Sequence, residues 1–306
     1  MNVAISVIIC TYNRAELLKH CLNSCARSVP AMVGLEFLVI DNNSNDHTNR
    51  VVMEMSTQIP NLRYIVESSQ GLSYARNRAI VEAKGEYVYY VDDDVLLDRA
   101  FLVNAQHIIA EAKPLIFGGP FTPWYHYGRP MWFQDRYASS DLTYVTRRVL
   151  PHGKFLTGCN FCVHKSLFDR FGNFDTRLGM RGGLVGYGEE TELQREIQNA
   201  GVEIWFDPQL KMDHVVNPER LSVDWYIQSG WALGRDRVLS GKVSRSKFYL
   251  ATVLVVGVTL TVITGIVCGF KLLLRRDYYI ENWWIDTFRK AAKRAAILYT
   301  SSLTRS

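Results

Sequence analysis

Charged residues are absent from one part of this 306-residue chain, the 23 residues from Phe248 to Phe270. An uncharged apolar run of that length is long enough to cross the hydrocarbon core of a bilayer. A buried core helix is the alternative, but such a helix rarely runs so far without one charge. We therefore expect a membrane-embedded segment over 241–276. Basic residues flank the run at both ends, which leaves a spanning helix and a re-entrant hairpin both open.

Cysteine is scarce, and the six present show no disulfide framework. Cys159 and Cys162 form a single CxxC pair without the second pair or the histidines that a structural zinc site needs. Buried thiols in a reducing compartment are the expected state. No signal peptide is expected either, because a β-branched run begins at Ala4. We therefore expect the chain at the cell membrane, with the part that precedes the apolar run on the cytoplasmic side.

A positive surplus is absent from residues 1–247, which carry 27 basic and 27 acidic side chains. A nucleic-acid partner would need a basic patch on the folded domain, so none is expected. The net charge of +5 comes from residues 271–306, with 8 basic and 3 acidic side chains. Beside an apolar run, such a tail predicts contact with anionic lipids. We expect residues 277–306 to form a basic amphipathic helix at the membrane interface.

A strand that ends in acids stands out among the features that are present. Tyr87–Val91 is apolar or aromatic throughout and leads directly into Asp92, Asp93 and Asp94. The run predicts a strand buried on both faces of a sheet, after which ionised carboxylates must meet water or a cation. Two carboxylates spaced Asp-x-Asp can hold Mg²⁺ or Mn²⁺, which in turn can hold a diphosphate. A solvated acidic turn that caps the next helix is the plainer alternative.

Strands alternate with helices through the first part of the chain. The expected strands are 4–10, 36–40, 62–66 and 87–91, and the helices between them include 15–25 and 73–83. This alternation predicts right-handed βαβ units and a parallel sheet with helices on both faces. Polar clusters at 11–14 and 41–46 follow the first two strands, and such strand ends converge on one crevice. The sequence therefore predicts a ligand site at this edge of the sheet.

The second part of the chain is less regular. Further helices are expected at 101–112, 189–200 and 221–241, and further strands at 114–119 and 204–207. The aromatic residues between 120 and 151 lack periodicity and predict a long loop or small subdomain. We expect one domain over 1–240, in two halves at 1–118 and 119–240, with the ligand site at the strand ends in the first half.

In their order and spacing these motifs resemble the family 2 glycosyltransferases, which are inverting sugar-transfer enzymes with the GT-A fold. The resemblance covers roughly residues 4–240 and rests on four segments: Val7–Arg14, Asp41–Asp46, Gly71–Asn77 and Tyr90–Asp94. It implies an α/β fold, with a Rossmann-like, mixed but mostly parallel sheet and flanking helices. It also implies transfer of a sugar from a nucleotide-diphosphate sugar, expected to be a UDP-sugar. The acceptor would be a hydroxyl of a saccharide or lipid-linked acceptor in cell-surface glycan assembly.

The resemblance implies roles for single residues as well. The donor-binding set would be Thr11, Asn13, Arg14, Asp41, Arg76, Asp92 and Asp93. Asp41 would accept a hydrogen bond from the nucleotide base, and Arg76 would approach the nucleotide or its phosphates. Asp94 would be the main ligand of a Mg²⁺ or Mn²⁺ ion, with Asp92 and His214 as weaker candidates. A helix cap is the alternative for Asp41, and a surface ion pair is the alternative for Arg76.

The general base is expected in the pair Glu189 and Glu190. The family usually has Glu-Asp here with the aspartate as base, so Glu190 falls at the base position with one more methylene. That departure leaves the choice between the two glutamates open. Acidic residues in the first turn of a helix also stabilise the helix dipole, which is the structural alternative.

Two other functions stay open on the sequence. A nucleotidyltransferase would also use metal-binding carboxylates on an α/β sheet, but it would need a glycine-rich phosphate loop after the first strand. Thr11–Arg14 contains no glycine. A non-catalytic, membrane-bound sugar-binding module would be favoured if the acids at 92–94 and 189–190 lay far apart.

Overall fold

A computed structural model describes residues 4–28, 34–241, 243–244 and 246–303. The chain forms two compact units, and each is assembled from separate segments. The first contains Met1–Trp124, Ala138–Thr176 and Glu189–Val215, and the second contains Tyr125–Tyr137, Arg177–Gly188 and Val216–Ser306.

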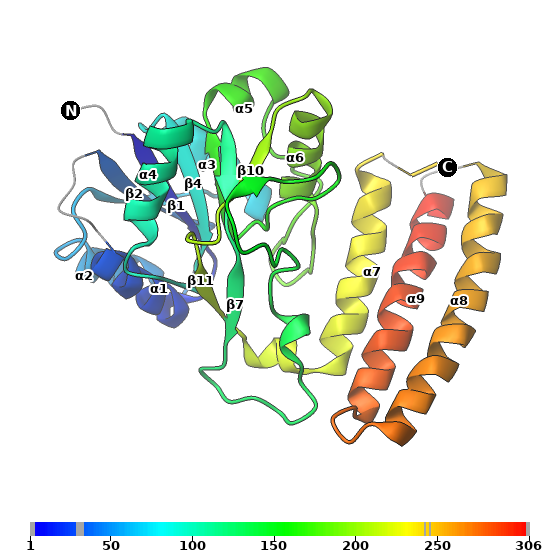
Figure 1. Cartoon of the computed structure of the whole chain (residues 1–306). Helices are drawn as coiled ribbons and strands as arrows, with labels where there is room; N and C mark the ends of the chain where they lie inside the picture. The colour runs from blue at the N-terminus through cyan, green and yellow to red at the C-terminus, as the bar shows by residue number, and fades with distance from the viewer. Residues whose placement is uncertain (1–3, 29–33, 242, 245, 304–306) are drawn as a thin grey trace. The chain divides into compact units, whose positions relative to one another are not determined.

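An eight-stranded sheet forms the centre of the first unit (Figure 1). In spatial order its strands are β3 (Leu62–Val66), β2 (Leu35–Asp41), β1 (Ile5–Thr11), β4 (Tyr87–Asp92), β9 (Asn160–His164), β6 (Ile116–Gly118), β10 (Ile204–Phe206) and β8 (Arg148–Val149). The first four are parallel, β9 runs antiparallel between β4 and β6, and β10 is parallel to β6. The predicted mixed, mostly parallel sheet is confirmed.

Helices cover both faces of this sheet, as predicted. The hydrophobic core on one face of the sheet includes buried residues of α1 (Ala15–Ser28), α2 (Thr48–Met55) and α4 (Phe101–Ala112). The core on the other face includes buried residues of α3 (Leu72–Glu82), α5 (Ser166–Phe171) and α6 (Glu189–Asn199). In β4, Tyr87, Tyr89 and Val91 face the first core, while Val88 and Tyr90 face the second. Successive side chains point to opposite faces, so a strand covered on both sides needs an unbroken apolar run.

A second, three-stranded sheet lies beside the carboxyl end of β4. It consists of β5 (Val95–Leu97), β11 (Met212–Val215) and β7 (Phe121–Trp124), in that order. The sequence predicted none of these three strands, because strands of three or four residues carry too little periodicity. His214 pairs with Val95 across this sheet. The pairing brings a histidine next to the three aspartates.

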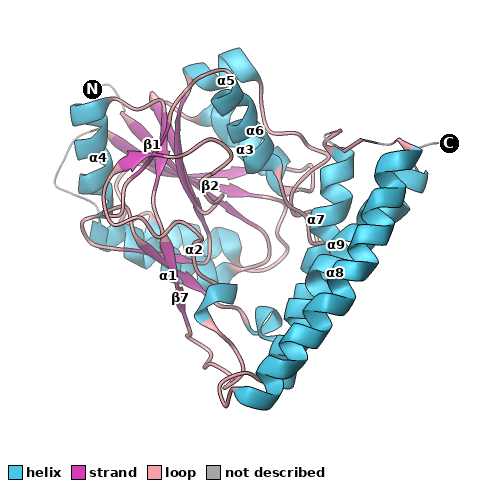
Figure 2. Cartoon of the chain, turned by 45° about the vertical axis from the view of Figure 1, so that its right-hand side comes forward, coloured by secondary structure: helices cyan, strands magenta, loops and turns pink. Residues whose placement is uncertain are grey.

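Three long helices dominate the second unit: α7 (Val223–Leu239), α8 (Lys247–Leu274) and α9 (Ile280–Leu303) (Figures 1 and 2). Short 3₁₀ turns, η1 (Asp135–Tyr137) and η2 (Pro218–Leu221), belong to the same unit. Among the described residues, α8 is the one helix long and apolar enough to cross a membrane. The helix expected within the basic tail 277–306 is α9, which begins at Ile280 and ends at Leu303.

The two faces of α7 differ in burial: Tyr226 is buried and Trp231 is exposed. The buried positions include the small residues Gly230 and Gly234. A Cβ on these glycines would lie 2.2 Å and 2.1 Å from the backbone carbonyl oxygens of Arg289 and Lys293. Close backbone packing between α7 and α9 therefore decides which face is buried.

Candidate functional site

Polar residues end three neighbouring strands at the same edge of the sheet. Thr11 at the end of β1 is in register with Asp41 at the end of β2. On the other side of β1, Cys10 is in register with Asp92, where β4 ends. The structure therefore brings together the three strand ends that the sequence predicted to converge.

A network of hydrogen bonds and ion pairs links the turn after β1 to the aspartates after β4. Thr11 Oγ1 donates to Asp93 Oδ2 at 2.8 Å. Arg14 Nη1 lies 3.2 Å from both Asp93 Oδ1 and Asp94 Oδ2. Burial raises the pKa of Asp93 to about 6, although the Arg14 guanidinium acts to lower it. Thr11 and Arg14 thus hold the aspartate turn in place, and their contact with a nucleotide stays a prediction.

Asn13 and Asp41 connect the turns that follow β1 and β2. Asn13 adopts a left-handed backbone conformation with φ of 53°. Its backbone N–H donates to Ser44 Oγ at 2.9 Å, and its side-chain oxygen accepts from the backbone N–H of Asn45 at 2.8 Å. Asp41 is buried and accepts from the backbone N–H of Ser44 at 2.8 Å. These bonds fix the edge of the site, while a bond from Asp41 to a nucleotide base stays a prediction.

The capping alternative for Asp41 is wrong, because another aspartate fills that role. Asp46 Oδ1 accepts from the backbone N–H of Thr48 at 3.0 Å, at the start of α2. Its Oδ2 accepts from the backbone N–H of Ala15 at 3.0 Å, at the start of α1. Asp41 Oδ2 instead accepts from the hydroxyl of Tyr64, a partner that the sequence did not indicate.

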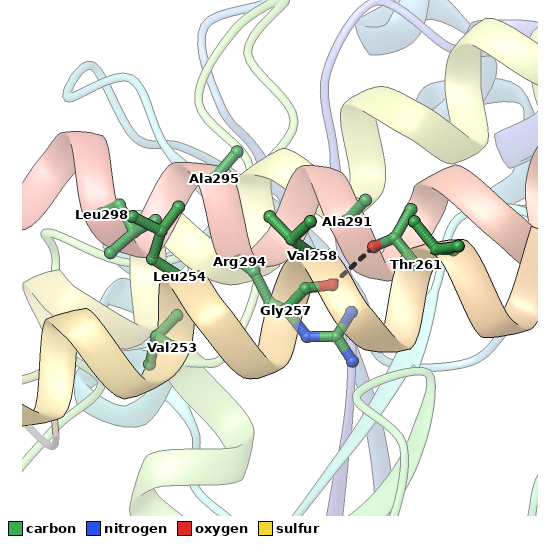
Figure 3. A pocket seen from close by; sticks show the side chains of 10 residues that line it. Val253, Leu254, Gly257, Val258, Thr261, Ala291, Arg294, Ala295 and Leu298 are labelled. Carbon is green, nitrogen blue, oxygen red and sulfur yellow. Dashed lines mark hydrogen bonds between the residues drawn. The ribbon is translucent and has the colours of Figure 1, made fainter.

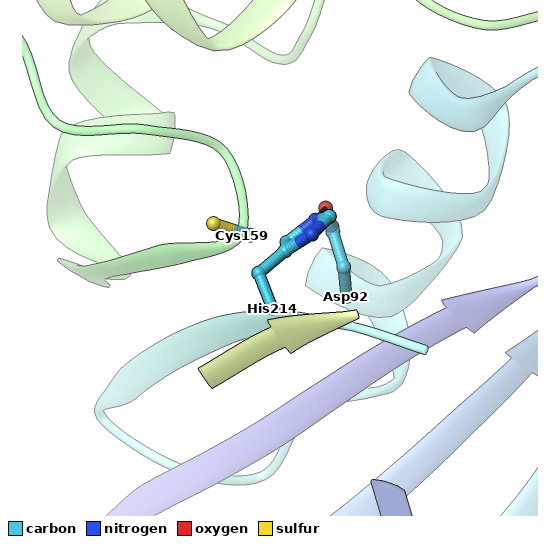
Figure 4. A group of neighbouring side chains, drawn as sticks. All are labelled: Asp92, Cys159 and His214. Atoms are coloured by element: carbon cyan, nitrogen blue, oxygen red, sulfur yellow. Dashed lines mark ion pairs between the residues drawn. The ribbon is translucent and has the colours of Figure 1, made fainter. Parts of the chain in front are cut away.

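Asp94 and Asp92 meet His214, as the metal prediction requires. His214 Nε2 lies 3.2 Å from Asp94 Oδ1 and 4.0 Å from Asp92 Oδ2. Ligand atoms of Asp92, His214 and Cys159 lie within 4.8 Å of one another (Figure 4). Carboxylates and imidazole suit a divalent ion such as Mn²⁺, whereas a thiolate is a softer ligand. These residues fit a metal ion, and Cys159 is an addition that the sequence did not indicate.

Arg76 joins the two acidic groups that lie about a hundred residues apart in the chain. Its Nη1 is 2.6 Å from Glu189 Oε1, and its Nη2 is 3.7 Å from Asp92 Oδ1. Nη2 also donates to the carbonyl oxygen of Gly158 at 3.1 Å. Arg76 is only 3% exposed, so its contact with Glu189 is buried, in contrast to the surface pair considered from the sequence. The guanidinium carbon lies 5.6 to 5.7 Å from the ring centroids of Tyr90, Phe161 and Phe174.

The two glutamates at the start of α6 have different surroundings. Glu189 is buried, and its Oε2 has no hydrogen-bond partner among the residues that the structure describes. Burial, together with the neighbouring Glu190 carboxyl, raises the pKa of Glu189 to about 8 against the lowering effect of Arg76. Glu190 is half-buried, and a Cβ on Gly158 would lie 3.4 Å from its carboxyl carbon. Glu190 is therefore the more accessible carboxylate of the pair.

The raised pKa of Glu189 predicts how stability depends on pH. Between its ordinary pKa of 4.5 and about 8, the folded protein holds a proton on Glu189 that the unfolded chain has lost. The free energy of unfolding should therefore fall as pH rises from about 5 to 8, because the folded protein binds more protons than the unfolded chain in this range. The Glu189→Gln variant should lack this component. Urea denaturation of both proteins across this range measures the difference.

The matched control is Glu196→Gln, which removes a charge from an exposed position on the same helix. Its stability should follow the wild-type pH dependence. Parallel pH curves for wild type and Glu189→Gln would show that Glu189 is ionised in the folded protein across the whole range.

Known proteins with similar sequences and folds were compared with this chain. Succinoglycan biosynthesis protein ExoM of Rhizobium meliloti (strain 1021) is 25% identical over 235 residues, which is 76% of this chain and 73% of that protein. Glycosyltransferase AglE of Haloferax volcanii is 37% identical over 116 residues, 38% of each chain.

Solved structures share the fold. Mannosyltransferase PcManGT from Pyrobaculum calidifontis, in complex with GDP-Man and Mn²⁺, matches with a TM-score of 0.64 and 17% identity. The match covers 100% of this chain and 89% of that one. Residues 1–349 of TarS from S. aureus, in complex with UDP, match with a TM-score of 0.54 and 18% identity, over 96% and 91% of the two chains.

The family model described as Glycosyl transferase family 2 matches residues 6–172, more than half of the chain. That match spans β1 to α5 and so includes the strand ends, the three aspartates and Arg76. With the GT-A-like sheet in place, the sequence and the fold agree, and this chain belongs to glycosyl transferase family 2.

Proposed function

We propose that this glycosyltransferase moves a sugar from a nucleotide-diphosphate sugar to an acceptor hydroxyl with inversion at the anomeric carbon. The observation that carries the proposal is the buried guanidinium of Arg76, which contacts Glu189 and Asp92 together. The aspartates at 92–94, which could hold a metal ion that binds the donor's diphosphate, therefore lie beside the glutamates at 189–190. One of those glutamates could activate the acceptor hydroxyl. Inverting transfer needs both groups at one reaction centre.

Asp94, Asp92 and His214 would hold a Mn²⁺ or Mg²⁺ ion. Their oxygen and imidazole donors support this assignment. Two structural neighbours support it as well, since PcManGT was solved with GDP-Man and Mn²⁺, and GalNAc-T7 with UDP, GalNAc and Mn²⁺. A divalent ion bound here would offset the negative charge that develops on the diphosphate leaving group. Arg14, which contacts Asp94, keeps that carboxylate in position.

Glu190 is proposed as the general base. The acceptor hydroxyl oxygen would attack the anomeric carbon while the bond from that carbon to the diphosphate breaks on the opposite face. Glu190 would take the hydroxyl proton, and the nucleoside diphosphate would leave. Glu189 is less suited to this task, because it is buried and paired with Arg76. Its proposed role is to position Arg76.

The remaining donor contacts are proposed from the geometry of the strand ends. Thr11, Asn13 and Arg14 would form the wall against the nucleotide, and Asp41 would accept from the base, as expected for a UDP-sugar. Asp93, bonded to Thr11 and Arg14, would hold this wall to the metal-binding turn.

The proposed acceptor is a saccharide or a lipid-linked saccharide of a cell-surface glycan. GalNAc(5)-diNAcBac-PP-undecaprenol beta-1,3-glucosyltransferase of Campylobacter jejuni is 33% identical over 116 residues, 37% of this chain and 37% of that protein. That name describes an acceptor linked to undecaprenol, which is a lipid. The apolar helix α8 further supports a location at the cell membrane, and we propose the cytoplasmic side for the catalytic unit.

The alternatives from the sequence receive less support. A sugar-binding module would be favoured by distant acidic groups, yet Asp92 and Glu189 share one arginine. A nucleotidyltransferase would require a phosphate loop, and the turn after β1 is instead bonded to the turn after β2.

Nucleotide titration tests the proposal directly. Isothermal titration with UDP and with GDP should give binding in the presence of Mn²⁺ that weakens at least tenfold when EDTA removes the ion, because the diphosphate is held chiefly through the metal. UMP, which lacks the second phosphate, should bind weakly in both conditions. Equal binding of UDP, GDP and UMP with and without metal would contradict a metal-held diphosphate.

A further inference from the structure

Helix α8 exposes almost all of its apolar surface. Of its most apolar 18 residues, only 6% are buried by the rest of the described chain. Large side chains project outward on several sides, among them Val255, Val262, Ile266 and Phe270, which are 56 to 65% exposed. A surface of this kind is not stable in water and indicates contact with lipid or a partner.

Helix α9 runs antiparallel along α8 and places a charged side chain beside the middle of α8. Trp283 Nε1 donates to the carbonyl oxygen of Gly265 at 2.9 Å. Two turns of α8 earlier, a Cβ on Gly257 would lie 2.9 Å from Arg294 Cδ, so the arginine stem crosses α8 at this glycine (Figure 3). Gly257 lies within two residues of the midpoint of the uncharged run 248–270. Arg294 therefore stands level with the centre of the apolar helix.

Helix α9 is also held firmly to α7. Gly230 and Gly234 of α7 leave room for the backbone of α9 at Arg289 and Lys293, as described above. Asn282 Nδ2 donates to the carbonyl oxygen of Trp132 at 2.7 Å, which joins α9 to the 125–137 segment of the same unit. Detaching α9 from this unit would break both contacts. The position of α9 beside α8 is thus part of the packing of the unit.

Basic side chains gather on α7 and α9. Arg237, Arg289, Lys293 and Arg294 lie near one another. Burial, together with the positive charges of the three arginines, lowers the pKa of Lys293. Among the described residues, none of these four makes an ion pair with a carboxylate. Arg289 instead lies over the ring of Tyr226, at 5.4 Å from its centroid. Such a cluster is complementary to anionic groups from outside the chain.

We propose that α8 lies along one face of an anionic membrane instead of crossing it, with its apolar side in the lipid and the basic residues of α7 and α9 at the phosphate head groups. If α8 crossed, α9 would enter the hydrocarbon with Asp286, Arg289, Lys290, Lys293 and Arg294. Each charge at that depth is costly, and five together are incompatible with stable insertion. If the three helices lie at the membrane interface, the apolar surface of α8 contacts lipid and the basic residues of α7 and α9 stay at the head groups. The inference rests on the membrane location proposed above and is independent of the transfer chemistry.

Cysteine labelling distinguishes the two arrangements. Asp277→Cys places a thiol in the turn between α8 and α9, where the side chain is 69% exposed, and Arg50→Cys places one on α2 of the catalytic unit, at 77%. The full chain is expressed in cells, and a membrane-impermeant maleimide is applied to intact cells and to inverted membrane vesicles. The wild-type chain, with five buried thiols and the half-buried Cys10, gives the background.

Both thiols should react from the same side of the membrane. Labelling from opposite sides would overturn the proposal, as would reaction of Asp277→Cys only after detergent, which would place the turn inside the bilayer. Because labelling needs no turnover, loss of the proposed transferase activity would not affect this result.

Vesicle binding tests the role of charge. The purified chain should float with vesicles rich in phosphatidylglycerol and bind phosphatidylcholine vesicles far less. Lys290→Glu, at an exposed position of α9, should weaken binding to the anionic vesicles by about tenfold. Lys154→Glu, an equal change of charge at an exposed position of the catalytic unit, should leave it unchanged. Equal binding to both vesicle types, or equal effects of the two variants, would contradict the proposed orientation.

Discussion

Replacing Asp94 with asparagine is expected to lower the rate of sugar transfer by about 10³-fold, while the folded structure is retained. The carboxylate lies 3.2 Å from both Arg14 Nη1 and His214 Nε2. Asparagine keeps the shape of the side chain but removes the charge that would bind the metal. Arg14 keeps its ion pair with Asp93, so the turn after β4 should remain in place.

Transfer assays across a range of Mn²⁺ concentrations check this expectation, and circular dichroism reports on the fold. Nucleotide binding should lose its dependence on Mn²⁺ in the same variant. Asp213→Asn is the matched control, because Asp213 is exposed on β11 next to His214 and its Oδ1 accepts from Thr122 Oγ1. Folded Asp94→Asn protein with near-normal transfer would remove Asp94 from the metal site.

The second large effect is expected at Glu190, with a different signature. Glu190→Gln should bind nucleotide and metal as the wild type does, yet transfer sugar about 10² to 10⁴-fold more slowly. Glutamine fills the same space beside Gly158 but cannot take a proton from the acceptor hydroxyl. Single-turnover transfer combined with nucleotide titration separates the two steps.

Comparison with Glu189→Gln resolves the choice that the sequence left open. Glu189 is expected to act through Arg76, so its replacement should disturb stability and its pH dependence, as described above, and Glu196→Gln should change neither rate nor binding. If Glu189→Gln were the variant that binds normally but fails to transfer, the assignment of the base would pass to Glu189. If Glu190→Gln instead lost nucleotide affinity, Glu190 would be part of the donor site.

Local patterns carried much of the prediction. The unbroken apolar run of β4 predicted burial on both faces of the sheet, and the structure confirms it. The helix at 101–112 was predicted with the bounds that α4 has, because its apolar spacing and ends are encoded within a dozen neighbouring residues. By contrast, Asp41 and Asp46 stand in one polar cluster, and only the direction of each carboxylate in the folded turn showed that Asp46 makes the helix caps.

The sequence by itself determined the first four strands, the longer helices and the edge of the sheet at which polar residues collect, because each depends on the period and polarity of adjacent side chains. The tertiary structure decided that Arg76 and Glu189, 113 positions apart, meet in the core, and that Cys159 joins Asp92 and His214. It also decided that an arginine of α9 stands at the middle of α8. Such contacts depend on how distant segments pack, and the free energy of that packing is a property of the whole core, which no local pattern contains.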